Sequence, residues 1–133
     1  MRKILFRGKR TDNGEWVEGY YLNQRESLTD KKACYIAANN GYGFNYISVI
    51  PETVGQYTGL HDKNGRKIFE GDILIYFGEK NLVEWDDSEA TFFLSNEDNE
   101  RCYFDDVDVN LMFIIGNIYD NPELGGVKQN ERI

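Results

Sequence analysis

The sequence predicts a mainly β protein built from short antiparallel strands. Runs rich in β-branched and aromatic residues recur along the chain, and Gly, Asn, Asp and Pro signals separate them at intervals of about eight to twelve residues. Phe, Tyr and Trp make up 14% of the 133 residues and hydrophobic residues 41%, which indicates a folded core with large, rigid side chains. The elements below are predicted in chain order.

The first predicted element is a hairpin close to the N-terminus. Residues 3–10 alternate loosely, residues 15–22 are β-prone, and the turn sequence Thr11-Asp-Asn-Gly14 separates them. Residues 23–33 are polar and without periodicity, so we expect a loop or one short helical turn there.

Two short strands and a bend follow this hairpin. Residues 34–38 and 46–50 are each predicted as a short strand, separated by the turn-rich residues 39–45. Pro51 then introduces either a single helical turn, because proline suits the first helical position, or a polyproline-like bend.

A second hairpin is predicted in the middle of the chain, where residues 57–62 and 66–70 flank Asn64-Gly65. Two turns fit: a type I′ turn, or a type I turn whose glycine is left-handed in a G1 bulge. Gly71-Asp72 is predicted to bend the chain into the strand at residues 73–77.

The C-terminal half continues as a meander. Residues 81–86 and 90–95 are expected to pair beyond the strand at 73–77, and residues 102–104 form a short β candidate. A longer strand is predicted over residues 108–115. Apolar residues of period two would share one face of it: Val107, Val109, Leu111, Phe113 and Ile115. Met112 and Ile114 would lie on the other face, so we expect at least the end of this strand to be covered on both sides.

These elements predict a small SH3-like barrel with its core at about residues 53–119, capped or extended by the N-terminal hairpin. Asp120 and Pro122 predict a short C-terminal helical turn, and residues 125–133 are expected to form a frayed tail. The length predicts one domain over residues 1–133, with a weak internal boundary near residue 50.

The net charge of −8 is unevenly distributed. Residues 1–25 carry six Lys and Arg against three Asp and Glu, whereas the remainder carries nine against twenty. This balance argues against a general affinity for nucleic-acid phosphates, which requires clustered cations. Within residues 84–108 ten acids face only Arg101, which indicates a solubilising surface or an acidic face for a basic partner.

No catalytic, cofactor or metal site is predicted. His61 is the only histidine, and it lies beside a turn, where solvated histidines are ordinary. Asp105, Asp106 and Asp108 offer oxygen ligands without the spacing of a calcium loop, so a solvated acidic face is favoured. Cys34 and Cys102 share no motif and are predicted to be reduced thiols.

The chain contains neither an apolar run of about 18 residues nor an export signal, so we predict a cytoplasmic protein without a membrane span.

The N-terminal hairpin and the residues near it contain a candidate binding surface. Trp16, Tyr20, Tyr21 and Tyr57 are candidates for an aromatic platform for a peptide or for bases. The basic residues beside it are Arg7, Lys9 and Arg10, and His61 is added as a further candidate. The favoured alternative is that the hairpin aromatics simply pack against the barrel.

The central motifs resemble the YopX family of phage-borne proteins. They are Thr53-Val-Gly-Gln-Tyr-Thr-Gly-Leu, Asp62-Lys-Asn-Gly and Ile68-Phe-Glu-Gly-Asp-Ile. Shorter matches extend the resemblance over nearly the whole chain: Phe6-Arg-Gly-Lys, Glu15-Trp-Val with Gly19, Tyr46-Ile, Gly116-Asn-Ile-Tyr and Asn121-Pro-Glu-Leu. The resemblance implies a phage or prophage product in the cytoplasm of a bacterial host, with a β-rich, SH3-type barrel. It implies no activity and no catalytic residue.

Taken together, the sequence predicts a non-enzymatic module that binds an unknown host or phage protein. The alternatives are a nucleic-acid-binding accessory protein that uses the basic N-terminal hairpin, or an acidic decoy that imitates DNA. Open sheet edges also make a homo-oligomer acceptable, although no sequence feature sets a stoichiometry.

Overall fold

The computed structural model describes residues 3–26 and 31–124. These residues form two antiparallel sheets, which confirms the mainly β class. The chain divides into two compact units, Met1–Tyr57 and Thr58–Ile133. The division falls a little beyond Pro51, where the sequence suggests a weak boundary, and the single domain over residues 1–133 stays a prediction.

The first unit contains the N-terminal strands and one 3₁₀ turn: β1 (Phe6–Lys9), β2 (Trp16–Glu26), β3 (Lys31–Asn39), β4 (Phe44–Ser48), η1 (Pro51–Thr53) and the start of β5 (Gly55–His61). Its strand order is β4-β3-β2-β1-β5, so β4 lies at an edge. The predicted hairpin of residues 3–22 is confirmed, with Gly14 left-handed in its turn. Pro51 begins a helical turn, not a polyproline-like bend.

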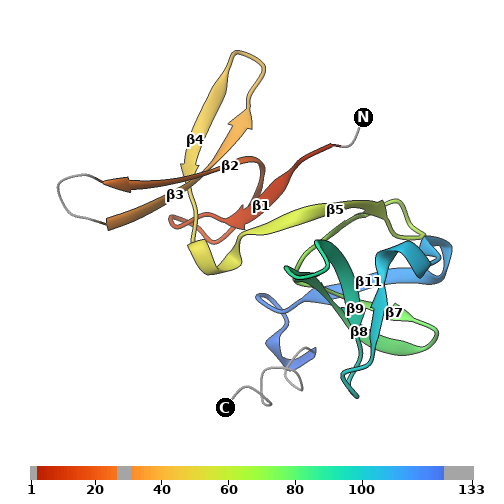
Figure 1. The fold of residues 1–133 in the computed structure, drawn as a ribbon. Helices are drawn as coiled ribbons and strands as arrows, with labels where there is room; N and C mark the ends of the chain where they lie inside the picture. Colours follow the sequence, from red (N-terminus) through yellow and green to blue (C-terminus); the bar gives the residue numbers. More distant parts are fainter. Residues whose placement is uncertain (1–2, 27–30, 125–133) are drawn as a thin grey trace. The chain divides into compact units, whose positions relative to one another are not determined.

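The loop or helical turn expected at residues 23–33 is wrong. β2 and β3 instead form a long two-stranded ribbon, paired from Tyr20 with Ala37 to Glu26 with Lys31 (Figure 1). The ladder bonds of such a ribbon join backbone groups, so a polar sequence without alternation can still be a strand. Residues 27–30 lie outside the described part of the chain.

One face of this sheet encloses a small apolar core. Cys34, Ile36 and Val49 are buried, and partly buried side chains pack against them from Phe6, Val17, Tyr21 and Val54. Val49 follows β4 and forms a bridge with Arg10 after β1, which draws the strand ends together around the core. Gly19 makes this curvature feasible, because a Cβ at that position would collide with the carbonyl oxygen of Ala37.

The second unit holds the remaining strands and 3₁₀ turns: β6 (Lys67–Phe69), β7 (Asp72–Tyr76), β8 (Glu79–Asp86), β9 (Thr91–Ser95), β10 (Arg101–Tyr103), η2 (Phe104–Asp106), η3 (Val109–Leu111) and β11 (Met112–Asn117). Its five-stranded sheet has the order β10-β9-β8-β7-β11. The predicted meander of β7, β8 and β9 is confirmed. Its buried core includes Ile68, Leu74, Val83, Leu94 and Met112.

The central turn takes the second of the two predicted forms. Gly65 is left-handed with φ 82°, Asn64 is not, and the amide of Gly65 donates to the carbonyl of Asp62 at 3.0 Å. This is a type I turn followed by a left-handed glycine, as in a G1 bulge. Gly71, with φ 93°, makes the predicted bend into β7, and Tyr119 lies so close that a Cβ would touch its ring at 3.0 Å.

The strand predicted at residues 108–115 is only partly correct. Residues 109–111 form the turn η3, whose first amides are capped when the Asp108 carboxylate accepts from Asn110 N at 3.0 Å. The strand β11 begins at Met112, and its buried face carries Met112 and Ile114. The predicted strand start at residue 108 is therefore wrong, because the Asp108 cap and the turn η3 replace its first residues. Phe113 and Ile115 are half-buried opposite Met112 and Ile114, as expected for a strand end covered on both sides.

The described strands form no closed barrel, so the SH3-like barrel is not confirmed for the core predicted at residues 53–119. A helical turn does begin at Pro122 and reaches residue 124, where the description ends. The expected frayed tail at 125–133 lies outside the described residues. Within the described ranges, no helix is both long and apolar enough to cross a membrane.

Candidate binding surface

The strand register of the first unit sorts its side chains onto two faces. Residues opposite each other in an antiparallel pair point to the same side, and alternate residues of a strand do the same. One face holds the core around Ile36. The opposite face, here called the outer face, carries Arg7, Lys9, Trp16, Glu18, Tyr20, Leu22, Tyr35, Ala37, Phe44 and Tyr46. Four of the eight candidate residues named above therefore share one face: Arg7, Lys9, Trp16 and Tyr20.

Two cations of β1 lie over the indole of Trp16. The guanidinium carbon of Arg7 is 4.5 Å from the ring centroid, and the Lys9 Nζ is 5.7 Å from it. The register explains both contacts, since Lys9 is paired with Trp16 and Arg7 with Glu18, one alternate position away. Such cation–π contacts fix the two positive charges at one end of the outer face.

Exposed aromatic rings occupy the rest of this face. Tyr20 is 57% exposed, Phe44 48% and Tyr46 65%, although they lie on ordered strands. The rings of Tyr20 and Phe44 are 5.8 Å apart across β3, and Ala37 between their strands is 6% exposed. The small side chain at position 37 leaves room for the two rings. Sequence reasoning missed Phe44 and Tyr46, although their alternation with polar Asn45 was a readable signal for one exposed face.

Within the first unit, Arg10, Tyr21 and Tyr57 do not contribute exposed side chains to the outer face. Arg10 follows the alternation of the core side, and its guanidinium forms two 2.9 Å hydrogen bonds with Asp12. Tyr57 is 5% exposed, and Tyr21 packs with the core against Phe6. His61 is exposed at the end of β5, in the second unit. For Tyr21 and Tyr57 the alternative of simple packing is thus the better description.

Asp62, beside His61, has a structural role. Its Oδ1 accepts from the amides of Asn64 and Arg66, and its Oδ2 accepts from the amide of Ile114, each at 2.9 Å. Burial by itself raises the pKa of this carboxyl, but the three backbone donors outweigh burial and hold the pKa below its ordinary value. Asp62 thereby joins the central turn to the outer edge of β11.

Two carboxylates of the acidic segment are hydrogen-bonded within the fold. The Asp86 carboxylate accepts from Ser88 Oγ at 2.7 Å, from Tyr103 Oη at 2.9 Å and from Arg101 at 3.0 Å. Hydrogen bonds from Ser88 and Tyr103 hold the pKa of Asp86 at about 2. Asp87 accepts from the indole of Trp85 at 2.6 Å. Two of the ten acids in residues 84–108 are therefore already hydrogen-bonded by their neighbours.

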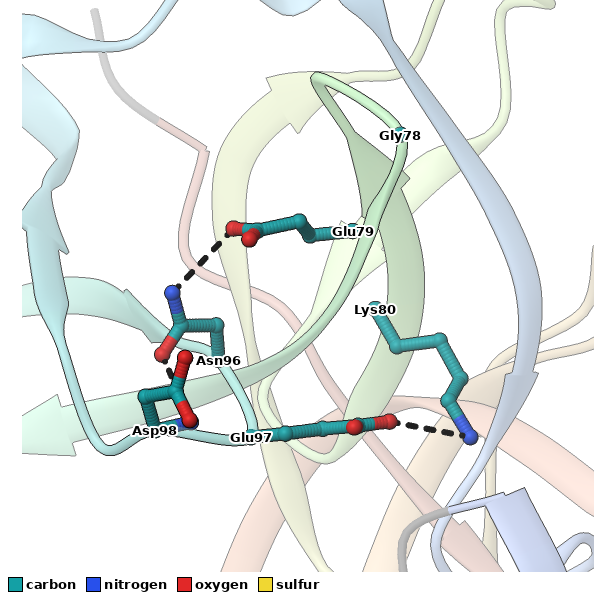
Figure 2. A pocket seen from close by; sticks show the side chains of 6 residues that line it. All are labelled: Gly78, Glu79, Lys80, Asn96, Glu97 and Asp98. Carbon is teal, nitrogen blue, oxygen red and sulfur yellow. Dashed lines mark hydrogen bonds and ion pairs between the residues drawn. The ribbon is translucent and has the colours of Figure 1, made fainter.

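A hollow of about 260 Å³ lies between the turn before β8 and the turn before β10, lined by Gly78, Glu79, Lys80, Asn96, Glu97 and Asp98 (Figure 2). Its polar groups bind one another: Asn96 donates to Glu79 at 3.2 Å, and Lys80 pairs with Glu97 at 3.3 Å. His61 is not among the lining residues. Among the residues that the structure describes, no group of three or more His, Cys, Asp or Glu is arranged to hold a metal ion.

Both cysteines are free thiols, as predicted. Cys34 is buried in the first core, where its sulfur lies 3.4 Å from the hydroxyl of Tyr21. Burial, followed by the interaction with this thiol, raises the pKa of Tyr21 to about 12. Burial likewise raises the pKa of Cys102. Because the thiolate is the reactive form, the raised pKa of Cys102 is that of a packing residue.

Comparison with known proteins agrees with this β architecture. The crystal structure of protein EF1440 from Enterococcus faecalis is similar, with a TM-score of 0.56 and 24% sequence identity over 93% of this chain and 99% of EF1440. At that identity the similarity shows the fold alone. No curated protein matches the chain. The family model described as YopX protein matches residues 5–124, which covers all but the ends of the sequence. The chain belongs to the YopX family.

Proposed function

We propose that this chain is a non-enzymatic binding module and that the outer face of its first unit binds a protein partner. The observation that carries the proposal is the exposure of Tyr20, Phe44 and Tyr46 on ordered strands, beside two cations held over Trp16. Aromatic and arginine side chains dominate the binding energy of protein interfaces. Contiguous exposed rings on a small unit are typical of an interaction site.

The charge of this face indicates the chemistry of the partner. The first unit carries eight Lys and Arg against six Asp and Glu, whereas the second carries seven against seventeen. Arg7 and Lys9 therefore lie in the less acidic part of the chain. A partner segment with a carboxylate beside an apolar side chain fits this surface, since the carboxylate meets the cations while the apolar group contacts the rings.

The proposal includes the cellular setting that the family resemblance implies. The chain would be a phage or prophage product that acts in the cytoplasm of the bacterial host, on a host or phage protein. For the second unit, an SH3-like arrangement is supported by the meander of β7 to β10 and the return of β11 to β7.

The experiment compares binding by variants that leave the core intact. Tyr20→Ser removes an exposed ring, Lys9→Glu reverses a charge on the same face, and Phe77→Ser removes a ring that is 73% exposed in the second unit. A protein captured by the wild-type chain from phage-carrying cells is purified, and its Kd is measured for each variant. We expect Tyr20→Ser to raise the Kd about 30-fold, as for a central interface residue, and Phe77→Ser to leave it unchanged. Equal Kd values for all variants would refute the proposal.

Single-stranded nucleic acid is the second candidate, because cations beside exposed rings also suit a phosphate backbone and stacked bases. Fluorescence anisotropy with labelled single-stranded DNA and RNA at low salt separates the two. Binding that disappears with Tyr20→Ser and weakens steeply with salt would assign the outer face to nucleic acid instead.

A further inference from the structure

We propose that the edge strand β4 pairs with β4 of a second copy of this chain, so that two first units share one continuous antiparallel sheet. The proposal rests on backbone groups at the sheet edge. It is independent of the partner protein proposed above, which would bind through side chains on the outer face.

The register of β3 and β4 identifies which backbone groups of β4 are directed outward. Bonded and non-bonded pairs alternate along an antiparallel ladder. The amide of Val49 donates to the carbonyl of Cys34 at 3.1 Å, so the bonded pairs that precede it are Ile36 with Ile47 and Ala38 with Asn45. The amides and carbonyls of the intervening residues Phe44, Tyr46 and Ser48 therefore point away from β3.

Only part of this outward edge is used within the described chain. The carbonyl of Ser48 accepts from the amide of Thr11 at 3.0 Å, which closes that end of the strand. Within the described ranges, the outward amides and carbonyls of Phe44 and Tyr46 have no backbone acceptor or donor. The outward backbone groups of Phe44 and Tyr46 are therefore available to pair with another strand.

These two positions are self-complementary. A twofold axis at Asn45 places Phe44 of one copy opposite Tyr46 of the other, and Tyr46 opposite Phe44. Each of these pairs exchanges two backbone hydrogen bonds, as in an ordinary antiparallel ladder. Because both side chains lie on the outer face, the pairing also brings the exposed rings of the two copies next to each other.

The charges favour a second copy as the occupant. Two copies of a chain with a net charge of −8 repel each other, so close pairing requires a locally neutral edge. Residues 39–50 contain no charged side chain. By contrast, β10 at the edge of the other sheet is flanked by Asp98, Glu100, Asp105 and Asp106. Charges of this kind normally protect an edge strand, and β4 lacks them.

Sedimentation equilibrium over a dilution series tests the proposal with the full chain. We expect a mass of twice 15.5 kDa for the wild type at high concentration. Tyr46→Pro removes one outward amide, which donates nothing to β3, and should give a monomer. Tyr46→Val is the matched control because it removes the ring but keeps the amide, and it should remain a dimer. Far-UV circular dichroism verifies the fold of both variants.

A second variant keeps the proposal testable if the proline variant does not fold. Asn45→Lys places two like charges opposite each other at the axis and should raise the dimer Kd about threefold to tenfold at low salt, less at high salt. Asn110→Lys adds the same charge to an exposed position of the second unit and should have no such effect. Hydrogen exchange should slow with concentration at the amides of Phe44 and Tyr46.

Three results would overturn the proposal. They are a wild-type monomer at every concentration, a dimer that Tyr46→Pro leaves intact, and exchange at Phe44 that is independent of concentration. If the wild-type chain is monomeric but a captured protein protects the amides of Phe44 and Tyr46, the edge belongs to an extended segment of that protein and not to a second copy.

Discussion

β4 of the first unit and β11 of the second are both end strands of their sheets, yet their outward backbone groups have different surroundings. On β11, the amide of Ile114 donates to the Asp62 carboxylate at 2.9 Å, and the carbonyl of Met112 accepts from Lys63 at 2.9 Å. On β4, the outward groups of Phe44 and Tyr46 meet no backbone partner among the described residues. The central turn therefore caps the outer edge of β11 in the second unit, whereas the outer edge of β4 in the first unit has no such cap.

The largest effect on stability is expected from removing the Asp62 carboxylate, which caps the outer edge of β11. Asp62→Ala leaves the buried amide of Ile114 and two turn amides without their acceptor, so we expect the free energy of unfolding of the second unit to fall by about 3 kcal/mol. Asp62→Asn keeps one oxygen for the turn and should lose about half as much. Urea unfolding followed by Trp85 fluorescence, in a Trp16→Phe background, measures both.

The pH dependence of this stability loss tests whether the ionised Asp62 carboxylate is its cause. The pKa of Asp62 is lowered in the fold, so its stabilising contribution is complete above the ordinary carboxyl pKa and declines as the pH falls below it. The Asp62→Ala variant should therefore lose less stability relative to wild type in acid than at neutral pH. A difference that stays constant with pH would contradict the role assigned to the carboxylate.

A smaller effect is expected at the acidic cluster of the second unit. Because the pKa of Asp86 is held at about 2, its contribution to stability is present above pH 4 and disappears as the pH falls toward 2. Asp86→Asn should therefore flatten the dependence of the urea midpoint on pH in this window. Asp105→Asn, in the turn η2, is the charge-matched control, because it removes one negative charge and keeps the hydrogen bonds that Asp86 accepts.

The turns of both units were predictable because each depends on the backbone conformation of a single residue, which the residue type itself indicates. Gly14 and Gly65 are left-handed in the two predicted hairpin turns, and Gly71 makes the predicted bend. The β2–β3 ribbon was not predictable, since its polar residues carry no alternation. The start of β11 was misjudged because the Asp108 cap belongs to a 3₁₀ turn that the period-two pattern does not reveal.

The candidate surface was predictable only in part, and for a related reason. Residues close in sequence, such as Lys9 and Trp16, are paired by a tight hairpin whose turn is legible. Phe44 and Tyr46 reach the same face through the register of β3, which sequence alone does not set. Asp62 accepts a hydrogen bond from Ile114, which is 52 residues away, a contact that sequence alone does not reveal.

The smallest expected effect is the difference between Arg7 and Lys9 in their interaction with Trp16. Arg7 lies closer to the Trp16 ring than Lys9, at 4.5 Å against 5.7 Å, and a guanidinium also stacks on an indole more favourably than an ammonium. Single substitutions would mix this contact with the other interactions of Arg7, so double-mutant cycles are needed.

With Arg7→Gln, Lys9→Gln and Trp16→Leu, we expect a coupling free energy of about 0.5–1 kcal/mol for Arg7 and Trp16. For Lys9 and Trp16 it should be less than about half of that. Urea unfolding followed by circular dichroism gives both values. Equal coupling free energies would mean that Trp16 stabilises the two cations equally, which would contradict the predicted preference for Arg7.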